Sequence, residues 1–83
     1  MSDENSRLLV LHRVIRIIDE EFAVDPERLT EKAELEYDLN LDSLDIIELI
    51  QQIEGEFKIE IPDYVADKFY TVGDVVNFLM KHI

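Results

Sequence analysis

The residues best suited to chemistry form one short motif, Asp42-Ser43-Leu44, in a chain that has no cysteine. The motif lies where a polar segment meets an apolar periodic one, which is typical of a helix start. Asp42 is then the expected N-cap residue, and Ser43 takes the first helical position with its hydroxyl exposed. A phosphate ester on that hydroxyl would face the N–H groups and the positive dipole of the helix start. Alone, Asp-Ser-Leu is more often an ordinary helix start, so the motif needs support from the rest of the chain.

Other candidate sites in the sequence are incomplete. The stretch 38–42 matches the D-x-N-x-D opening of a calcium loop, but Ser43 and Leu49 replace the glycine and the bidentate glutamate that the loop requires. The two histidines, His12 and His82, have no local signature of a zinc site or of a serine triad. The sequence therefore predicts neither a metal site nor a catalytic site, and without cysteine it has neither a disulfide nor a thiol of its own.

The charge is strongly negative and unevenly distributed. The 83 residues carry 20 acidic and 8 basic side chains, a formal net charge of −12, and residues 36–67 account for −9 of it. Such a field opposes binding to nucleic acid and anionic membranes and attracts basic protein surfaces. No stretch reaches the roughly 18–20 apolar residues of a membrane span, and the polar, acidic start is unlike a signal peptide. We expect one monomeric, cytoplasmic domain over residues 1–83.

Apolar periodicity predicts four helices and no strand. The expected ranges are 6–22, 43–57, a short helix over 64–69, and a last helix from Thr71 onward, where Thr71 and Asp74 suggest a capping box. The apolar face of the first helix is expected to contain Leu8, Leu11, Ile15, Ile18 and Phe22, in a stripe that Val10, Val14 and Ile17 widen. The expected fold class is all-α, a four-helix bundle with a long first connection and a short third helix.

The long connection, residues 23–41, needs its own anchors because connections beyond about 12–15 residues are usually functional or held by their side chains. Its apolar residues are expected to attach it to the bundle: Val24, Leu29, Leu35, Tyr37, Leu39 and Leu41. In the helix that follows, the core stripe is expected to contain Ile46, Leu49, Ile50, Ile53 and Phe57. Leu44 and Ile47 fall outside that stripe, beside acidic residues.

The segment from Asp38 to Leu49, followed by the segment from Ile53 to Asp63, resembles the acyl carrier protein family. Asp-Ser-Leu-Asp, then Glu-Leu, Glu-Phe and Ile-Pro-Asp at these spacings form a specific pattern, strongest over residues 36–63. The resemblance implies that a phosphopantetheinyl transferase attaches 4′-phosphopantetheine from coenzyme A to Ser43. The arm would carry acyl groups as thioesters, so the working thiol is imported and the protein is a carrier without catalytic activity.

The resemblance also implies two surfaces. A docking surface for basic patches on acyl synthases and acyltransferases would contain Asp42, Leu44, Asp45, Ile47, Glu48 and Glu54. An acyl pocket between the second and third helices would contain Ile46, Ile53, Ile61, Ala66 and Phe69. Burial of the cargo there would contribute about 0.8 kcal/mol per CH₂ group. One departure is Asn40, which stands where many members have glycine; Asn tolerates unusual backbone angles better than most residues.

The expected cargo is a fatty acyl group on its way through fatty-acid or related lipid biosynthesis, and two alternatives stay open. The chain could be a specialised carrier of a D-alanyl, aminoacyl or polyketide cargo, which loading assays with acyl and aminoacyl ligases would distinguish. It could also be an acidic helical adaptor that carries no arm and binds a basic partner helix. A test for attachment of the arm separates the adaptor from both kinds of carrier.

Overall fold

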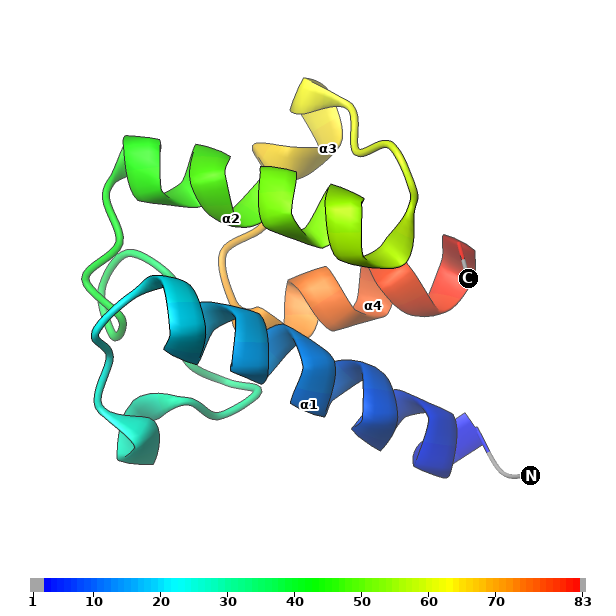
Figure 1. The fold of residues 1–83 in the computed structure, drawn as a ribbon, viewed down its shortest axis with the longest axis horizontal. Coiled ribbons are helices and arrows are strands. Elements are labelled where there is room, and N and C mark those ends of the chain that lie inside the picture. Colours follow the sequence, from blue (N-terminus) through cyan, green and yellow to red (C-terminus); the bar gives the residue numbers. More distant parts are fainter. Residues whose placement is uncertain (1–2, 83) are drawn as a thin grey trace.

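Four α-helices and one 3₁₀ turn make up the computed structural model, which describes residues 3–82 (Figure 1). The elements in chain order are α1 (Asp3–Glu21), η1 (Pro26–Arg28), α2 (Ser43–Phe57), α3 (Asp63–Ala66) and α4 (Val72–His82). Within residues 3–82 the β-type pairing consists of one isolated bridge between Glu34 and Thr71. The predicted all-α class, with four helices and a short third one, is confirmed. The assignment of residues 1–83 to one domain stays a prediction.

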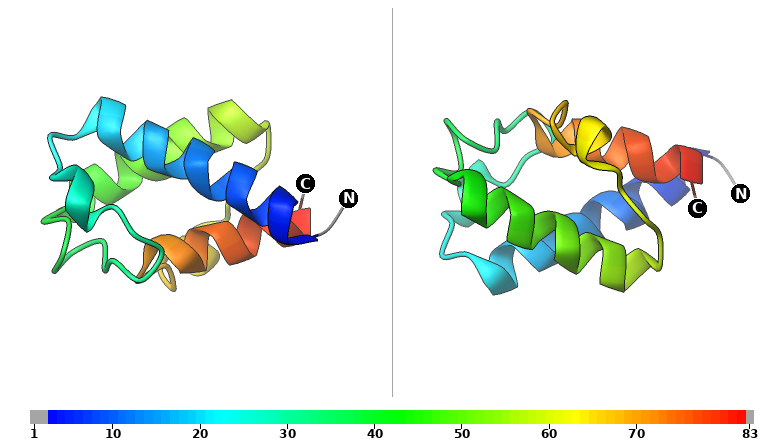
Figure 2. Two further views of the ribbon diagram at one scale, coloured as in Figure 1. Left: turned by 90° about the horizontal axis from the view of Figure 1, so that it is seen from below. Right: turned by 90° about the horizontal axis from the view of Figure 1, so that it is seen from above.

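The long helices pack around α1, which contacts both α2 and α4. The start of α1 and the end of α4 lie at one end of the bundle, as both views of Figure 2 show. The long connection and the start of α2 lie at the opposite end (Figures 1 and 2). The motif at residues 42–44 therefore lies at an end of the bundle, away from both ends of the described chain.

The predicted apolar face of α1 packs against the core, except at its first residue, Leu8. Val10, Val14 and Ile17 are buried, together with Ile18, whereas Leu8 is 51% exposed and Phe22 lies beyond the helix end. Leu11, Ile15 and Phe22 are half-buried and pack against the core, so the prediction is wrong only for Leu8. Both α2 and α4 contact α1, and the buried positions are centred on Val10, Val14 and Ile18, with Leu8 at the outer edge of the stripe.

The core draws on every long helix and on the connection. Its fully buried side chains are Val14, Ile18, Leu35, Leu49, Ile53, Val72, Val75, Val76 and Leu79. Among the residues whose burial the structure gives, no polar or charged side chain is buried. Apolar burial therefore accounts for the core without any internal polar network.

The connection between α1 and α2 is held by its leucines and by backbone bonds. Its buried leucines are Leu29, Leu35, Leu39 and Leu41, as predicted. The N–H of Leu35 donates to the carbonyl of Tyr70 at 2.8 Å, and the N–H of Val72 donates to the carbonyl of Ala33 at 3.0 Å. These two bonds join the connection to the start of α4. They restrict the motion of the segment that leads to α2.

Tyr37 does not anchor the connection, and that prediction is wrong: its side chain is 78% exposed. Tyr37 lies in a turn in which the carboxylate of Asp38 accepts the N–H of Glu34 at 2.7 Å. The flanking residues Leu35 and Leu39 point into the core. The turn between them leaves Tyr37 on the outside.

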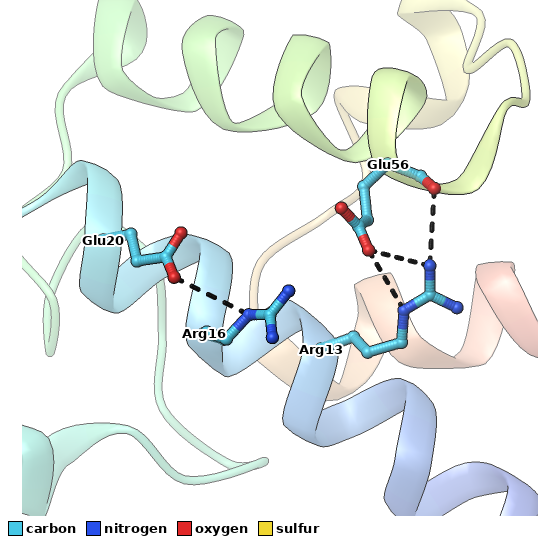
Figure 3. Close-up of polar contacts among 4 residues, drawn as sticks. All are labelled: Arg13, Arg16, Glu20 and Glu56. Carbon is cyan, nitrogen blue, oxygen red and sulfur yellow. Dashed lines mark hydrogen bonds and ion pairs between the residues drawn. The ribbon is translucent and has the colours of Figure 1, made fainter.

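An arginine on α1 holds the end of α2. Arg13 makes hydrogen bonds to Glu56 Oε2 at 2.8 Å and 3.3 Å (Figure 3). Its guanidinium also lies 4.2 Å from the centre of the Phe57 ring. The hydrogen bond from Arg13 holds the pKa of the Glu56 carboxyl below its usual value. Arg16 and Glu20 form a looser pair within α1, at 3.6 Å (Figure 3). Arg13 thus links the two helices at the solvent-exposed side of their contact.

The third helix is shorter than the predicted 64–69 and begins one residue earlier. Pro62 occupies the N-cap position, where the absence of an N–H costs nothing. After Ala66 the chain continues in tight turns, with the N–H of Lys68 donating to Val65 and that of Phe69 donating to Ala66, each at 3.0 Å. These turns bring the side chain of Phe69 to a buried position.

The fourth helix begins with the predicted capping box. Thr71 Oγ1 accepts the N–H of Asp74 at 3.1 Å, and Asp74 Oδ2 accepts the N–H of Thr71 at 3.0 Å. Asp74 replaces the glutamate or glutamine that is usual at this position. It also accepts the N–H of Tyr70 at 2.9 Å, which extends the cap by one residue.

The two glycines offer a matched test of packing. A Cβ at Gly55 would have nothing within 4 Å, whereas a Cβ at Gly73 would lie 3.0 Å from Cγ and 3.1 Å from the carbonyl oxygen of Glu31. That oxygen is fixed, because it accepts the Gly73 N–H at 2.8 Å. We expect Gly55→Ala to raise the free energy of unfolding by up to about 1 kcal/mol and Gly73→Ala to lower it. Urea unfolding followed by circular dichroism measures both, and changes in the same direction would contradict this packing.

Candidate functional site

The start of α2 is fixed by two reciprocal hydrogen bonds. Asp42 Oδ1 accepts the N–H of Asp45 at 2.9 Å, and Asp45 Oδ2 accepts the N–H of Asp42 at 3.1 Å. The predicted N-cap role of Asp42 is confirmed. The sequence analysis does not predict that the Asp45 carboxylate accepts the N–H of Asp42, although the same spacing at Thr71 and Asp74 predicts a capping box. The signal was an acid three residues after the N-cap.

Ser43 is the first residue of α2 and is exposed. A helix start leaves four N–H groups without partners inside the helix. The capping box supplies partners for those of Asp42 and Asp45, so helix geometry leaves the N–H groups of Ser43 and Leu44 at this end. A phosphate on the Ser43 hydroxyl would lie next to these two groups and the positive end of the helix dipole.

The approach to Ser43 depends on an unusual backbone angle at Asn40. Asn40 has φ 57°, in the left-handed region that few residues other than glycine and asparagine adopt. Leu39 and Leu41 on either side are buried, and the N–H of Leu41 donates to the carbonyl of Leu35 at 3.0 Å. The turn at Asn40 therefore lets both leucines reach the core just before the chain emerges at Asp42 and Ser43.

A groove with a volume of about 610 Å³ begins beside Ser43 and lies between α2 and the α3 region. Its lining residues are Glu36, Ser43, Ile46, Ile47, Ile50, Gln51, Glu54, Ile61, Asp63, Ala66, Asp67, Phe69 and Tyr70. Ile50, Ile61 and Phe69 are buried and form the floor, whereas Ile46 and Ala66 are half-buried. The groove is thus apolar at its base and acidic at its rim.

Four of the five predicted pocket residues line this groove: Ile46, Ile61, Ala66 and Phe69. Ile53 does not; it is fully buried in the core. Ile50, about one turn earlier, lines the groove instead, and both isoleucines belong to the predicted core stripe. The spacing of four residues from Ile46 could have indicated Ile50. Nothing in the sequence indicated Glu36 or Tyr70, because both reach the groove from loops.

The residues predicted for docking differ in how exposed their side chains are. Leu44 and Ile47 are 69% and 54% exposed, and Glu48 is exposed. Glu54 is half-buried, and its Oε2 accepts the N–H of Ile61 at 2.8 Å. Glu54 therefore ties the loop after α2 to the helix, in addition to any contact that it makes with a partner.

Two further findings on residues 3–82 concern membrane-spanning helices and metal ligands. No helix between residues 3 and 82 is long and apolar enough to cross a membrane. Within those residues, no three or more His, Asp or Glu side chains gather where they could hold a metal ion.

Comparison with known proteins agrees with this geometry. The family described as "Phosphopantetheine attachment site" matches residues 12–79. The acyl carrier protein of Phenylobacterium zucineum (strain HLK1) is 49% identical over 74 residues, which cover 89% of this chain and 94% of that protein. The chain belongs to the acyl carrier protein family. The acyl carrier protein of Caulobacter vibrioides (strain NA1000 / CB15N) is similar too, 50% identical over 72 residues that cover 87% of this chain and 92% of that protein.

Membership of the family establishes the cofactor and the general role. The chain carries acyl groups as thioesters on a 4′-phosphopantetheine arm. The family is one of carriers, whose work requires a phosphopantetheinyl transferase and acyl-transferring synthases as partners. The structure fits this cofactor at the start of α2, where an exposed hydroxyl borders a groove with an apolar floor.

The capping box makes a testable contribution to stability. Asp42→Ala removes the acceptor for the Asp45 N–H, so we expect the free energy of unfolding to fall by about 1 kcal/mol. Asp42→Asn keeps an acceptor oxygen and should lose less. Ser43→Ala, one residue along, changes an exposed side chain and serves as the control. Urea unfolding measures all three, and equal stability of Asp42→Ala and Ser43→Ala would argue against the box.

Proposed function

We propose that Ser43 is the attachment point of the arm. Its hydroxyl is exposed at the first position of α2, on a helix start that Asp42 and Asp45 hold in place. The observation that carries this proposal is the position of Ser43 at the edge of the groove. A group attached to Ser43 can reach solvent and partner enzymes, and it can also fold back over an apolar floor.

The residues around Ser43 then have distinct roles in loading. With the transferase bound, Ser43 Oγ loses its proton and forms a phosphoester bond, and the adenosine bisphosphate half of coenzyme A leaves. The N–H groups of Ser43 and Leu44 stabilise the negative charge of the new phosphodiester. Asp42 and Asp45 oppose this charge, so the chain orients the group without holding it tightly. The attached arm supplies the terminal thiol on which acyl groups are held.

The groove is the proposed shelter for the acyl cargo. Ile46 and Ala66 offer apolar walls, and Ile50, Ile61 and Phe69 offer the floor. Each CH₂ group buried there contributes about 0.8 kcal/mol. Glu54 keeps Ile61 in place through its hydrogen bond to the Ile61 N–H. Ile53 contributes from the core behind the groove, without lining it.

The outward face of α2 is the proposed docking surface. Leu44 and Ile47 offer exposed apolar area beside Ser43, and Glu48 adds negative charge within the same two turns. Asp42, Asp45 and Glu54 add further charge, although all three also make structural hydrogen bonds. Exposed ion pairs contribute only about 0–1 kcal/mol each, so docking on basic patches is fast, weak and sensitive to salt. These properties suit a carrier that visits many enzymes.

The remaining assignments follow from the family and from the charge. We propose that the chain serves fatty-acid or related lipid biosynthesis in the cytoplasm, as a monomer without catalytic activity of its own. The relatives named above support an acyl cargo. A dedicated carrier of a D-alanyl, aminoacyl or polyketide cargo would use the same attachment site. Loading assays with acyl and aminoacyl ligases tell these carriers apart.

Loading tests the attachment point directly. When the purified chain is incubated with coenzyme A and a broad-specificity phosphopantetheinyl transferase, its intact mass should increase by one 4′-phosphopantetheine group. Ser43→Ala should abolish that increase while its circular dichroism spectrum stays unchanged. An unshifted mass of the unaltered chain, with an enzyme shown to modify another carrier, would favour the acidic adaptor instead.

Charge reversal tests the docking surface. Glu48→Lys should slow acyl transfer to a partner synthase by about tenfold at low salt, because it puts a like charge against a basic patch. Asp19→Lys makes the same change of charge on an exposed position of α1 and should leave the rate almost unchanged. Equal rates for the two variants would remove Glu48 from the docking surface.

A further inference from the structure

The floor of the groove contains an aromatic ring that is held from behind. Phe69 lines the groove yet is only 8% exposed. Its ring meets Phe78 of α4 edge-on, with ring centres 5.7 Å apart and an angle of 63° between the planes. Phe78 in turn stacks on His82, at 4.1 Å and 27°. We call these three residues the aromatic column; only Phe69 among them lines the groove.

We propose that the aromatic column limits how deep an acyl chain can enter, and thereby sets the longest cargo that the chain shelters. This inference rests on the proposed function, in which Ser43 carries the arm. A short acyl chain lies over the floor of the groove, on the Phe69 ring and the side chains of Ile50 and Ile61. A longer chain needs space below the floor, and the first side chain that it must displace is Phe69.

The packing around Phe69 explains why it resists displacement. Edge-to-face aromatic pairs have favourable electrostatics in addition to their buried area, so a shift of Phe69 loses its contact with Phe78. Phe78 also stacks on His82, one helical turn later in α4, which adds a second contact to its ring. Phe69 belongs to the same buried core cluster as Ile53 and Leu79, and protein cores are close-packed, so a shift of the ring would have to displace neighbouring side chains.

The column can be tested by a substitution that lies outside the groove. Phe78 lies outside the lining of the groove, so its replacement changes the support of Phe69 without changing any surface that the cargo meets. If the depth limit came from the lining alone, Phe78 would have no effect on it. If it comes from the column, Phe78→Leu and Phe69→Leu shift the limit in the same direction.

The experiment loads the full chain with acyl arms of different lengths. Hexanoyl-, decanoyl- and hexadecanoyl-coenzyme A with a phosphopantetheinyl transferase give the acylated forms, and intact mass verifies each one. The melting temperature of each form is compared with that of the same variant carrying the arm without an acyl group, which removes the effect of the substitution on basal stability. We expect the gain in melting temperature to level off at a longer acyl chain in Phe69→Leu and Phe78→Leu than in the unaltered chain.

Gln52→Ala is the matched control, because Gln52 is an exposed residue of α2 that does not line the groove, and it should keep the unaltered profile. Identical profiles for the unaltered chain and both Phe variants would overturn the inference. In the unaltered hexadecanoyl form, nuclear Overhauser contacts between the acyl chain and the Phe69 ring are expected even if a variant fails to fold, and their absence would also overturn it. Failure to gain the mass of any arm would instead overturn the assignment of Ser43, and this inference with it.

Discussion

The reciprocal hydrogen bonds between Asp42 and Asp45 determine where α2 begins, and the functional surfaces depend on that point. With the helix starting at Ser43, residues three and four positions later fall on defined sides of it. Ile46 and Ile50 then face the groove, Ile47 lies at its exposed edge, and Leu44 faces solvent. A start shifted by one residue would leave Ser43 outside the helix or one place further in, and the hydroxyl would no longer lie at the helix tip.

The connection before α2 has to deliver this helix start without covering it. Leucines in the connection are buried, backbone bonds join it to the start of α4, and Asn40 adopts a left-handed angle just before the motif. The leucine anchors are buried in the core, whereas Asn40 itself is exposed. Asp42 and Ser43 are left exposed, and their position is nevertheless restrained. An enzyme that modifies Ser43 can therefore approach it without unfolding the core.

Local sequence predicted much of this arrangement. The bounds of α2, the N-cap role of Asp42 and the exposure of Leu44 and Ile47 follow from short-range periodicity and capping rules, and the structure agrees. Tertiary contacts decided the rest. The buried face of α1 depends on its two neighbours, and Glu36 and Tyr70 reach the groove from loops whose paths no periodicity describes. The hydrogen bond from the Ile61 N–H to Glu54 depends on how the loop after α2 folds back, which its composition does not reveal.

The central claim is that Ser43, at the tip of α2, bears the arm in the working protein. The most direct measurement is tandem mass spectrometry of peptides from the protein purified from the cells that make it naturally. The account predicts 4′-phosphopantetheine on Ser43, with the other serines and threonines, Ser2, Ser6, Thr30 and Thr71, unmodified. An arm found on any of those four residues, or a protein whose Ser43 is never modified, would contradict it.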